Sequence, residues 1–230
     1  VPDHTTLYRF LRRLDPTLIA RLLRKTARRV AGKGTTLAAG DGTGLTSGAV
    51  STFFVRRLHQ HAGGRMPWRH WLKWLVAVDI PHRVILAQEA KPGPTNHGAR
   101  LRPLITAAHA VVPVHTVLAD AEFDSELNHQ HIRQTVGATS IIPAKRGKPT
   151  WRIHGVRAVM RRRFPRRRYR QRAIIESMFS AVKRKLSSRA PGRTTATQVL
   201  QALVLGLTYN LYRVRRPFSG HAFAFLEGTV

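Results

Sequence analysis

The 230-residue sequence contains no cysteine, which excludes disulfide bonds and thiolate metal sites. This absence fits a reducing cytoplasm, where we expect the protein to act. The sequence also lacks any run of about 18 apolar residues, so it predicts no transmembrane helix. No signal peptide is recognisable at the N-terminus.

Acidic residues are scarce, with 11 Asp and Glu against 40 Lys and Arg, for a formal net charge of +29. Hydrophobic residues make up 43% of the chain, enough for a core, so the charge does not indicate disorder. A fold this positive repels itself unless a polyanion neutralises it, and arginine binds phosphate in a bidentate manner. We therefore expect nucleic acid as the partner, at the nucleoid rather than at a membrane, because no basic amphipathic terminal helix stands out.

The segment from Arg166 to Leu186 has the pattern of one amphipathic helix without Pro or Gly. With a rotation of about 100° per residue, the polar residues form one narrow stripe along the helix. An apolar stripe lies beside it and is expected to face the core. The polar stripe contains Tyr169, Arg172, Glu176 and Lys183, and the apolar stripe contains Ile175, Phe179, Val182 and Leu186. Glu176 would then be held at the edge of a packed face and still reach a substrate. The alternative is a surface glutamate bonded to a nearby arginine on a solvated helix.

Residues 1–32 are expected to form a helical N-terminal segment. Helices are predicted over 3–14, capped near Asp3 or Thr5, and from Pro16 to about Val30. The second helix would turn three leucines inward, namely Leu18, Leu22 and Leu23. Two basic helices this close together are either the end of a helix-turn-helix module or a brace that packs on the following domain.

The pattern after residue 33 predicts an α/β fold, a mixed sheet with helices packed on it. Residues 33–48 indicate a strand that ends in a glycine-rich turn at Asp41, and 71–80 with 82–91 indicate a hairpin whose turn includes Asp79. The remaining predicted elements are a helix over 99–111, a strand over 114–120 that ends in Asp120, a helix over 124–134 capped by Asp124 or Ser125, a strand over 139–147, the helix at 166–186 and a buried helix over 194–212.

Three acids stand at or near the ends of predicted elements: Asp41, Asp120 and Glu176. In α/β sheets, sites collect at strand ends. Three converging carboxylates repel one another unless cations lie between them, and oxygen ligands favour Mg²⁺ or Mn²⁺. Two such ions about 4 Å apart stabilise the attacking and leaving oxygens of a phosphoryl transfer. The basic run over 145–171 would hold the polyanion.

The spacing of Tyr169, Arg172, Glu176 and Lys183 resembles the Tyr-Arg-Glu-Lys signature of DDE transposases of prokaryotic insertion sequences, in the group of types four and five. AAGDGTGL is similar to the first-Asp strand of that family. VLADAEFDS is similar to its second-Asp motif and selects Asp120 over Asp124 as the equivalent acid. The resemblance covers about 35–212, and the order of elements resembles the ribonuclease-H-like core.

The resemblance implies a ribonuclease-H-like mixed β-sheet flanked by α-helices, with a DDE catalytic domain over 33–216 and a tail over 217–230. Residues 1–32 would be the remnant of a DNA-end-binding region. A homodimer on double-stranded DNA would bring transposon ends together and act on a target. Water would cut the strand, and the freed 3′-hydroxyl would attack the target. A nuclease without transfer activity and an inactive DNA-binding remnant are the alternatives.

The resemblance also implies roles for residues. Asp41, Asp120 and Glu176 would be catalytic and would bind two Mg²⁺ or Mn²⁺ ions. Tyr169, Arg172 and Lys183 would contact DNA near the transposon end or orient the glutamate. The basic run adds three further DNA-binding residues, Arg166, Arg167 and Arg168.

The sequence departs from the family pattern in the short spacing between Asp120 and Glu176 and also at individual residues. Glu122 stands where a glycine is usual, as an extra ligand or, in the interpretation we prefer, a surface acid. His97 occupies a loop that usually leads to an acid. Histidines also occur in two His-x-His pairs, His59/His61 and His129/His131. Without cysteine or a well-spaced third ligand we expect no zinc site, and we expect surface or loop histidines.

Overall fold

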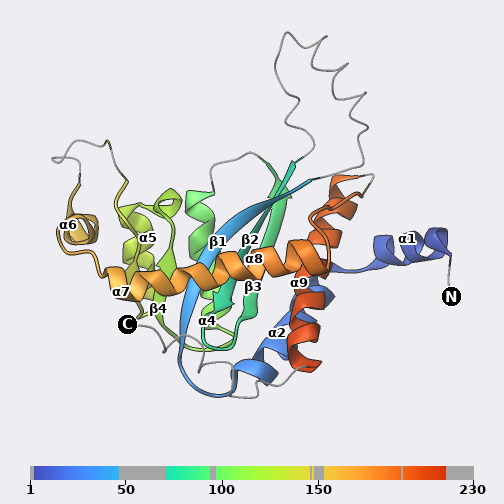
Figure 1. The fold of residues 1–230 in the computed structure, drawn as a ribbon, viewed down its shortest axis with the longest axis horizontal. Coiled ribbons are helices and arrows are strands. Elements are labelled where there is room, and N and C mark those ends of the chain that lie inside the picture. Colours follow the sequence, from blue (N-terminus) through green and yellow to red (C-terminus); the bar gives the residue numbers. More distant parts are fainter. Residues whose placement is uncertain are drawn as a thin grey trace, which may run out of the picture.

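The structure is a computed structural model that describes residues 3–46, 71–93, 97–145, 147, 153–192 and 194–215. In these ranges the chain forms a five-stranded sheet in the order β3-β2-β1-β4-β5 (Figure 1). The strands are β1 (Thr36–Thr46), β2 (Trp71–Asp79), β3 (Val84–Pro92), β4 (Val114–Ala119) and β5 (Thr139–Ile141). The β1–β2 and β2–β3 pairs are antiparallel, and the β1–β4 and β4–β5 pairs are parallel.

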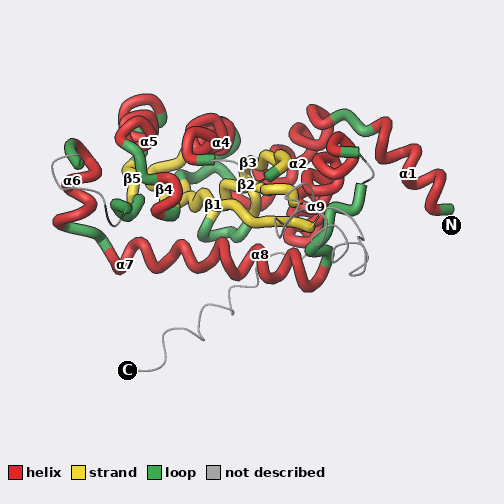
Figure 2. Tube along the Cα trace, turned by 90° about the horizontal axis from the view of Figure 1, so that it is seen from above, coloured by secondary structure: helices red, strands yellow, loops and turns green. Residues whose placement is uncertain are grey.

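Helices lie on both faces of the sheet. Figure 2 shows α4 and α5 on one face, α8 across the other, and α2 with α9 beside the β3 edge. The described helices are α1 (His4–Arg13), α2 (Pro16–Ala31), α4 (Leu101–His109), α5 (Glu126–Gln130), α6 (Gly155–Arg162), α7 (Arg166–Tyr169), α8 (Ala173–Lys185) and α9 (Thr195–Arg215). The predicted α/β fold, a mixed sheet flanked by helices, is confirmed. None of these described helices has the length and apolar character needed to cross a membrane.

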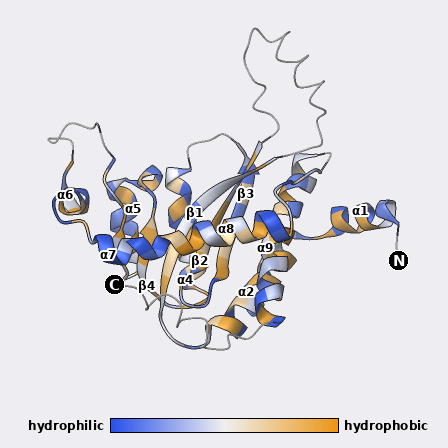
Figure 3. Cartoon of the chain, in the orientation of Figure 1, coloured by the Kyte–Doolittle hydropathy of each residue, from blue (hydrophilic) through white to orange (hydrophobic). Residues whose placement is uncertain are grey.

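The sheet separates two apolar cores, because side chains of a strand alternate between its faces. Ala38 of β1 belongs to the core that contains Leu101 and Ile105 of α4, whereas Ala39 belongs to the core that contains α8. The buried residues of α8 are Ile175, Met178, Phe179 and Val182. The apolar stripe predicted for this helix is therefore confirmed, except that Leu186 follows the helix end and is 39% exposed. Figure 3 shows the hydrophilic α7 followed by the mixed surface of α8.

The predicted turn at the glycine-rich segment is wrong, because β1 continues through it to Thr46 and Asp41 lies in mid-strand. Neighbouring side chains explain the glycines. A Cβ atom on Gly44 would lie 2.2 Å from the ring of Trp71, and one on Gly40 would lie 2.7 Å from Leu101 Cδ1. The glycines thus make room for an adjacent strand and for α4.

The other predicted elements are present with some corrected residues. Leu22 is exposed, since α2 turns Ile19, Leu23 and Ala27 inward at a spacing of four residues. Asp79 is the last residue of β2 rather than a turn residue, and its buried carboxylate accepts a hydrogen bond of 2.8 Å from the Thr36 hydroxyl. Five other predicted elements are corrected in part. The 139–147 strand spans only Thr139–Ile141, and the 124–134 helix consists of α5 followed by a π-helical turn. The 99–111 helix is a short 3₁₀ turn followed by α4, the 166–186 helix is interrupted at 170–172, and α9, which was predicted to be buried, exposes Leu211. The predicted tail over 217–230 and the pair His59/His61 lie outside the described residues.

A buried ion pair attaches α6 to the start of α5. Arg157 donates from Nε and Nη2 to the two carboxylate oxygens of Asp124, at 2.7 Å each, and the Lys145 amide donates to the same carboxylate at 2.9 Å. Burial by itself would raise the pKa of Asp124, but the bonds from Arg157 and Lys145 outweigh it and lower that pKa. Glu126 meanwhile accepts hydrogen bonds from the first amides of α6, those of Val156 and Arg157.

We predict that Asp124→Asn destabilises the protein strongly, because it leaves the guanidinium of Arg157 buried without a countercharge. The loss in free energy of unfolding should be about 3–5 kcal/mol, measured by urea unfolding at neutral pH. In the wild type the pair's contribution is complete above the unfolded-state value of 3.8 and is lost as the pH falls through the lower folded-state pKa of Asp124.

Glu122→Gln is the matched control, since Glu122 forms a surface ion pair with Lys73 at 3.3 Å. Its cost should be at most about 1 kcal/mol. Equal effects of the two substitutions would contradict the assignment of the Asp124–Arg157 pair as a buried anchor.

Candidate active site

The parallel pairing of β1 with β4 places two of the predicted acids side by side. Gly40 is paired with Ala119, so Asp41 and Asp120 follow at adjacent positions of the two strands. Residues two positions apart on a strand share a face. Asp41 therefore shares the face of Ala39, which lies in the core beneath α8, and Asp120 shares the face of Leu118 in the same core. Both acids are thus directed toward the α8 side of the sheet.

Arg172 connects the sheet to α8. It ends the 3₁₀ turn η6 (Arg170–Arg172), which interrupts the helix predicted over 166–186. Its Nη1 donates to Asp41 Oδ2 at 2.7 Å, and its Nη2 donates to Glu176 Oε1 at 2.5 Å. Arg172 Cζ also lies 5.7 Å from the ring centroid of Tyr169, and that ring packs edge-on against Phe164. A single guanidinium therefore bridges two of the predicted catalytic acids.

Backbone amides orient the two acids on the sheet. Asp41 Oδ1 accepts a hydrogen bond of 2.7 Å from the Gly42 amide, and Asp120 Oδ1 accepts one of 2.6 Å from the Ala121 amide. Each carboxylate is thereby held by one oxygen. The second oxygen of Asp41 accepts the bond from Arg172.

Burial and charge act against each other at Asp41. Burial is the largest influence and raises its pKa, and the charge of Asp120 raises it further. The Gly42 amide and Arg172 lower the pKa but do not compensate fully, so the pKa of Asp41 stays above its ordinary value. The negative charges of this site in turn raise the pKa of Arg172 despite its burial. The ionised form of Asp41 is therefore only partly stabilised, and an additional positive charge beside it would stabilise it further.

The oxygen donors suit a hard divalent cation, but in this arrangement they are not gathered around one point. Across the described ranges, no three acidic or histidine side chains form a group that could hold a metal ion. The Glu176 side chain is 59% exposed, and Arg172 takes the place of a cation between it and Asp41. Carboxylate oxygens are the donors that Mg²⁺ and Mn²⁺ prefer, so the side chains of Asp41, Asp120 and Glu176 fit such an ion by their chemistry. Metal binding by these acids stays a prediction.

The remaining predicted DNA-binding residues lie along the same run of helix. Arg166, Arg167 and Arg168 are exposed and make up the single turn of α7 together with Tyr169, which follows them. Lys183 lies in the last turn of α8, two turns beyond Glu176. This distribution gives a basic strip along α7 and α8 that passes over the paired acids.

Several polar residues are engaged elsewhere. Asp124 is committed to Arg157, and Glu122 forms the surface pair with Lys73. The expectation of surface or loop histidines is wrong for His129, which is buried with Nδ1 2.7 Å from Ser140 Oγ. Sequence reasoning missed the Asp124–Arg157 pair, because Arg157 is one of many cations in the basic run over 145–171 and no local pattern connects it to Asp124.

We predict that Arg172→Gln raises the pKa of Asp41 still further, because a nearby positive charge that lowers this pKa is removed. The measurement is a pH titration of carboxyl carbon shifts in protein labelled with ¹³C-aspartate and ¹³C-glutamate. Glu89, which pairs with Arg100, is the internal control and should titrate unchanged. An Asp41 titration that is unmoved or shifted to lower pH would contradict the bridge.

Comparison with known proteins complements this geometry. The catalytic core domain of BIV integrase, a crystal structure, matches 76% of this chain and 82% of its own length at 15% sequence identity, with a TM-score of 0.42. No curated protein matches the sequence. A family model described as a transposase DDE domain matches residues 34–211, which include all three predicted acids. The chain belongs to the family of proteins that carry the transposase DDE domain.

Proposed function

We propose that this protein cuts DNA at transposon ends and joins the freed strands to target DNA, as a member of the type four and five group of insertion-sequence transposases. The observation that carries the proposal is the meeting of Asp41, Asp120 and the Arg172–Glu176 pair on one side of the sheet. Family membership and the net charge of +29 support DNA as the substrate.

The three acids would hold two Mg²⁺ or Mn²⁺ ions. Bound there, the metal would supply stabilisation of the attacking and leaving oxygens in a phosphoryl transfer. The protein's own contribution is orientation, since the Gly42 and Ala121 amides fix Asp41 and Asp120 by one oxygen each. Glu176, being more exposed, would swing in from α8 to complete the set.

Arg172 would couple DNA binding to metal binding. Its guanidinium donates hydrogen bonds to Asp41 and Glu176, and arginine binds phosphate oxygens in the same bidentate way as carboxylates. A DNA phosphate that captures the guanidinium would release both carboxylates for metal. Tyr169 would support Arg172 through its ring, and the strip formed by Arg166, Arg167, Arg168 and Lys183 would hold the DNA backbone.

The N-terminal segment over 1–32 would contact the transposon end, with 33–216 as the catalytic domain. Helix α1 extends away from the sheet in both views (Figures 1 and 2), and none of its residues is buried. Exposed Leu7 and Phe10 give it an apolar side. Two protomers would be needed to hold two ends, so we propose a homodimer at synapsis.

An inactive DNA-binding remnant is the second candidate. The specific observation in its favour is that Asp41 and Glu176 are both ion-paired with the Arg172 guanidinium. In a remnant this bridge would be permanent. A nuclease that cuts without joining is a third outcome, and it would give nicked products without joined ones.

We predict that Asp41→Asn, Asp120→Asn and Glu176→Gln each lower cleavage and joining by at least about 100-fold, because each removes one group that would stabilise the transition state. The assay uses duplex DNA carrying the terminal repeats that flank the gene, with Mg²⁺ or Mn²⁺, and resolves nicked from joined products. DNA affinity should be retained in all three variants, since each removes negative charge.

Glu122→Gln is the control and should retain full activity. A wild-type protein that neither nicks nor joins would sink the transposase proposal in favour of the remnant. Nicked products without joined ones would support the nuclease. A DNA-dependent repressor effect unchanged by Asp41→Asn would also support the remnant.

We predict that a short DNA duplex increases the affinity of the wild type for Mn²⁺ by about 5- to 150-fold, the usual range of coupling between sites. Arg172→Gln should bind Mn²⁺ more tightly than the wild type without DNA and gain little from its addition. Electron paramagnetic resonance of free Mn²⁺ measures both affinities directly.

Arg184→Gln is the charge-matched control, because Arg184 lies on the same helix and its guanidinium bonds only to a backbone carbonyl of α8 among the described contacts. Its Mn²⁺ affinity should match the wild type. If Arg172→Gln and Arg184→Gln bind Mn²⁺ equally, Arg172 does not control access to the acids.

A further inference from the structure

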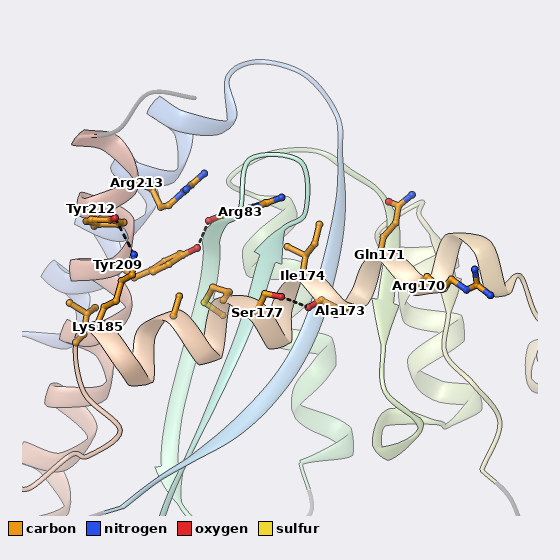
Figure 4. A pocket seen from close by; sticks show the side chains of 13 residues that line it. Arg83, Arg170, Gln171, Ala173, Ile174, Ser177, Lys185, Tyr209, Tyr212 and Arg213 are labelled. Atoms are coloured by element: carbon orange, nitrogen blue, oxygen red, sulfur yellow. Dashed lines mark hydrogen bonds between the residues drawn. The ribbon is translucent and has the colours of Figure 1, made fainter. Parts of the chain in front are cut away.

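A cavity of about 930 Å³ lies on the far side of α8 from the candidate active site. Figure 4 shows it between α8, the C-terminal part of α9 and the turn that joins β2 to β3. Met178, Ala181 and Lys185 line it from α8. At about 100° per residue these positions lie roughly opposite Glu176 on the helix, so the cavity is separate from the paired acids.

The charged side chains that line this cavity are all cationic. They come from three parts of the chain: Arg83, Arg170, Lys185 and Arg213. No acidic residue occurs among the described lining residues. Between the cations the wall is apolar, formed chiefly by Ile174, Met178, Ala181 and Leu186. The cavity thus combines a positive rim with an apolar floor.

The turn that carries Arg83 is held in a strained conformation by α9. Arg83 has a φ of 55°, in the left-handed region that residues other than glycine seldom adopt. The Tyr209 hydroxyl donates to the Arg83 carbonyl at 2.9 Å, and Arg213 Nη2 donates to the His82 carbonyl at 3.2 Å. Strain of this kind persists where surrounding contacts enforce it, and it is common at ligand-binding sites.

Tyr212 supplies an aromatic surface beside the cations. It is half-buried, and Lys185 Nζ lies 5.4 Å from its ring centroid and 3.4 Å from its hydroxyl. Figure 4 shows both side chains at one end of the cavity, next to Tyr209. An aromatic ring with an adjacent cation suits a ligand that carries both a flat apolar ring and a negative charge.

We propose that this cavity binds an unpaired DNA strand, with phosphates at the cationic rim and a base against Tyr212. Single-strand sites combine a positive groove with aromatic platforms for bases. A duplex keeps its bases stacked inside and offers no base to an apolar floor. The volume is near the top of the range of about 300–1,000 Å³ for small-ligand pockets, so it exceeds the needs of a lone anion. This site extends the proposed function, because its ligand would be a displaced or cut strand held apart from the acids.

The test measures binding of fluorescent oligothymidylate and of a duplex of equal length by anisotropy, without metal. Tyr212→Leu should weaken single-strand binding about fivefold or more, the usual loss on removing one stacking residue. Lys185→Gln should weaken it as well. Duplex affinity should change no more in these variants than in the control.

Arg184→Gln is that control, since it removes the same charge one residue from Lys185 and does not line the cavity. An equal loss of single-strand binding in Arg184→Gln and Lys185→Gln would overturn the proposal, as would an equal loss for duplex and single strand. Melting curves of the variants establish that they are folded. A more conservative variant, Tyr212→Phe, keeps the ring and should bind normally.

Photocrosslinking of wild-type protein with 5-iodouracil-substituted oligothymidylate locates the bound base. The crosslink should fall on the α9 peptide that contains Tyr209 and Tyr212. Crosslinks confined to α7 would overturn the proposed single-strand site. Displacement of the oligonucleotide more readily by poly-glutamate than by unlabelled oligonucleotide would overturn it as well. Because no metal or cleavage is involved, failure of the catalytic proposal would leave this result standing, and the reverse also holds.

Discussion

The parallel pairing of Gly40 with Ala119 is the constraint on which the candidate site depends. It places Asp41 in β1 beside Asp120, the residue that follows β4, on the same face of the sheet. A slip of one residue would turn a strand's side chains to the opposite face, toward α4. Arg172 contacts Asp41 because η6, the turn that leads into α8, lies over this face of the sheet. The site is therefore a product of sheet register first and of the helix sequence second.

Much of the fold could be predicted because its signals are local. The hairpin of β2 and β3, the short apolar β4 and the apolar stripe of α8 each follow from periodicity over a few residues. The glycine-rich β1 could not, since glycine usually indicates a turn and the reason for its glycines is the approach of Trp71 and Leu101 from elsewhere in the chain. Leu22 was wrongly predicted to face inward, because α2 carries apolar residues on several faces and the sequence alone does not select the buried one.

The candidate site could likewise be predicted only where its signals are local. The spacing from Tyr169 to Glu176 is enough to place these residues on one side of a helix. The contact of Arg172 with Asp41, and the burial that raises the pKa of Asp41, depend on how two distant segments cross. The Asp124–Arg157 pair and the cationic cavity behind α8 likewise join residues from separate elements, and no local pattern marks them.

The glycines of β1 have a consequence for how the protein folds. Glycine weakens a strand, yet β1 lies at the centre of the sheet and pairs with β2 and β4, both of which follow it in the chain. During synthesis, β1 leaves the ribosome long before Val114–Ala119 exists to pair with it. Closing so distant a pair is slow, and an unpaired central strand exposes two edges meanwhile. The same register that aligns the acids thus makes the nascent chain vulnerable to aggregation until β4 is complete.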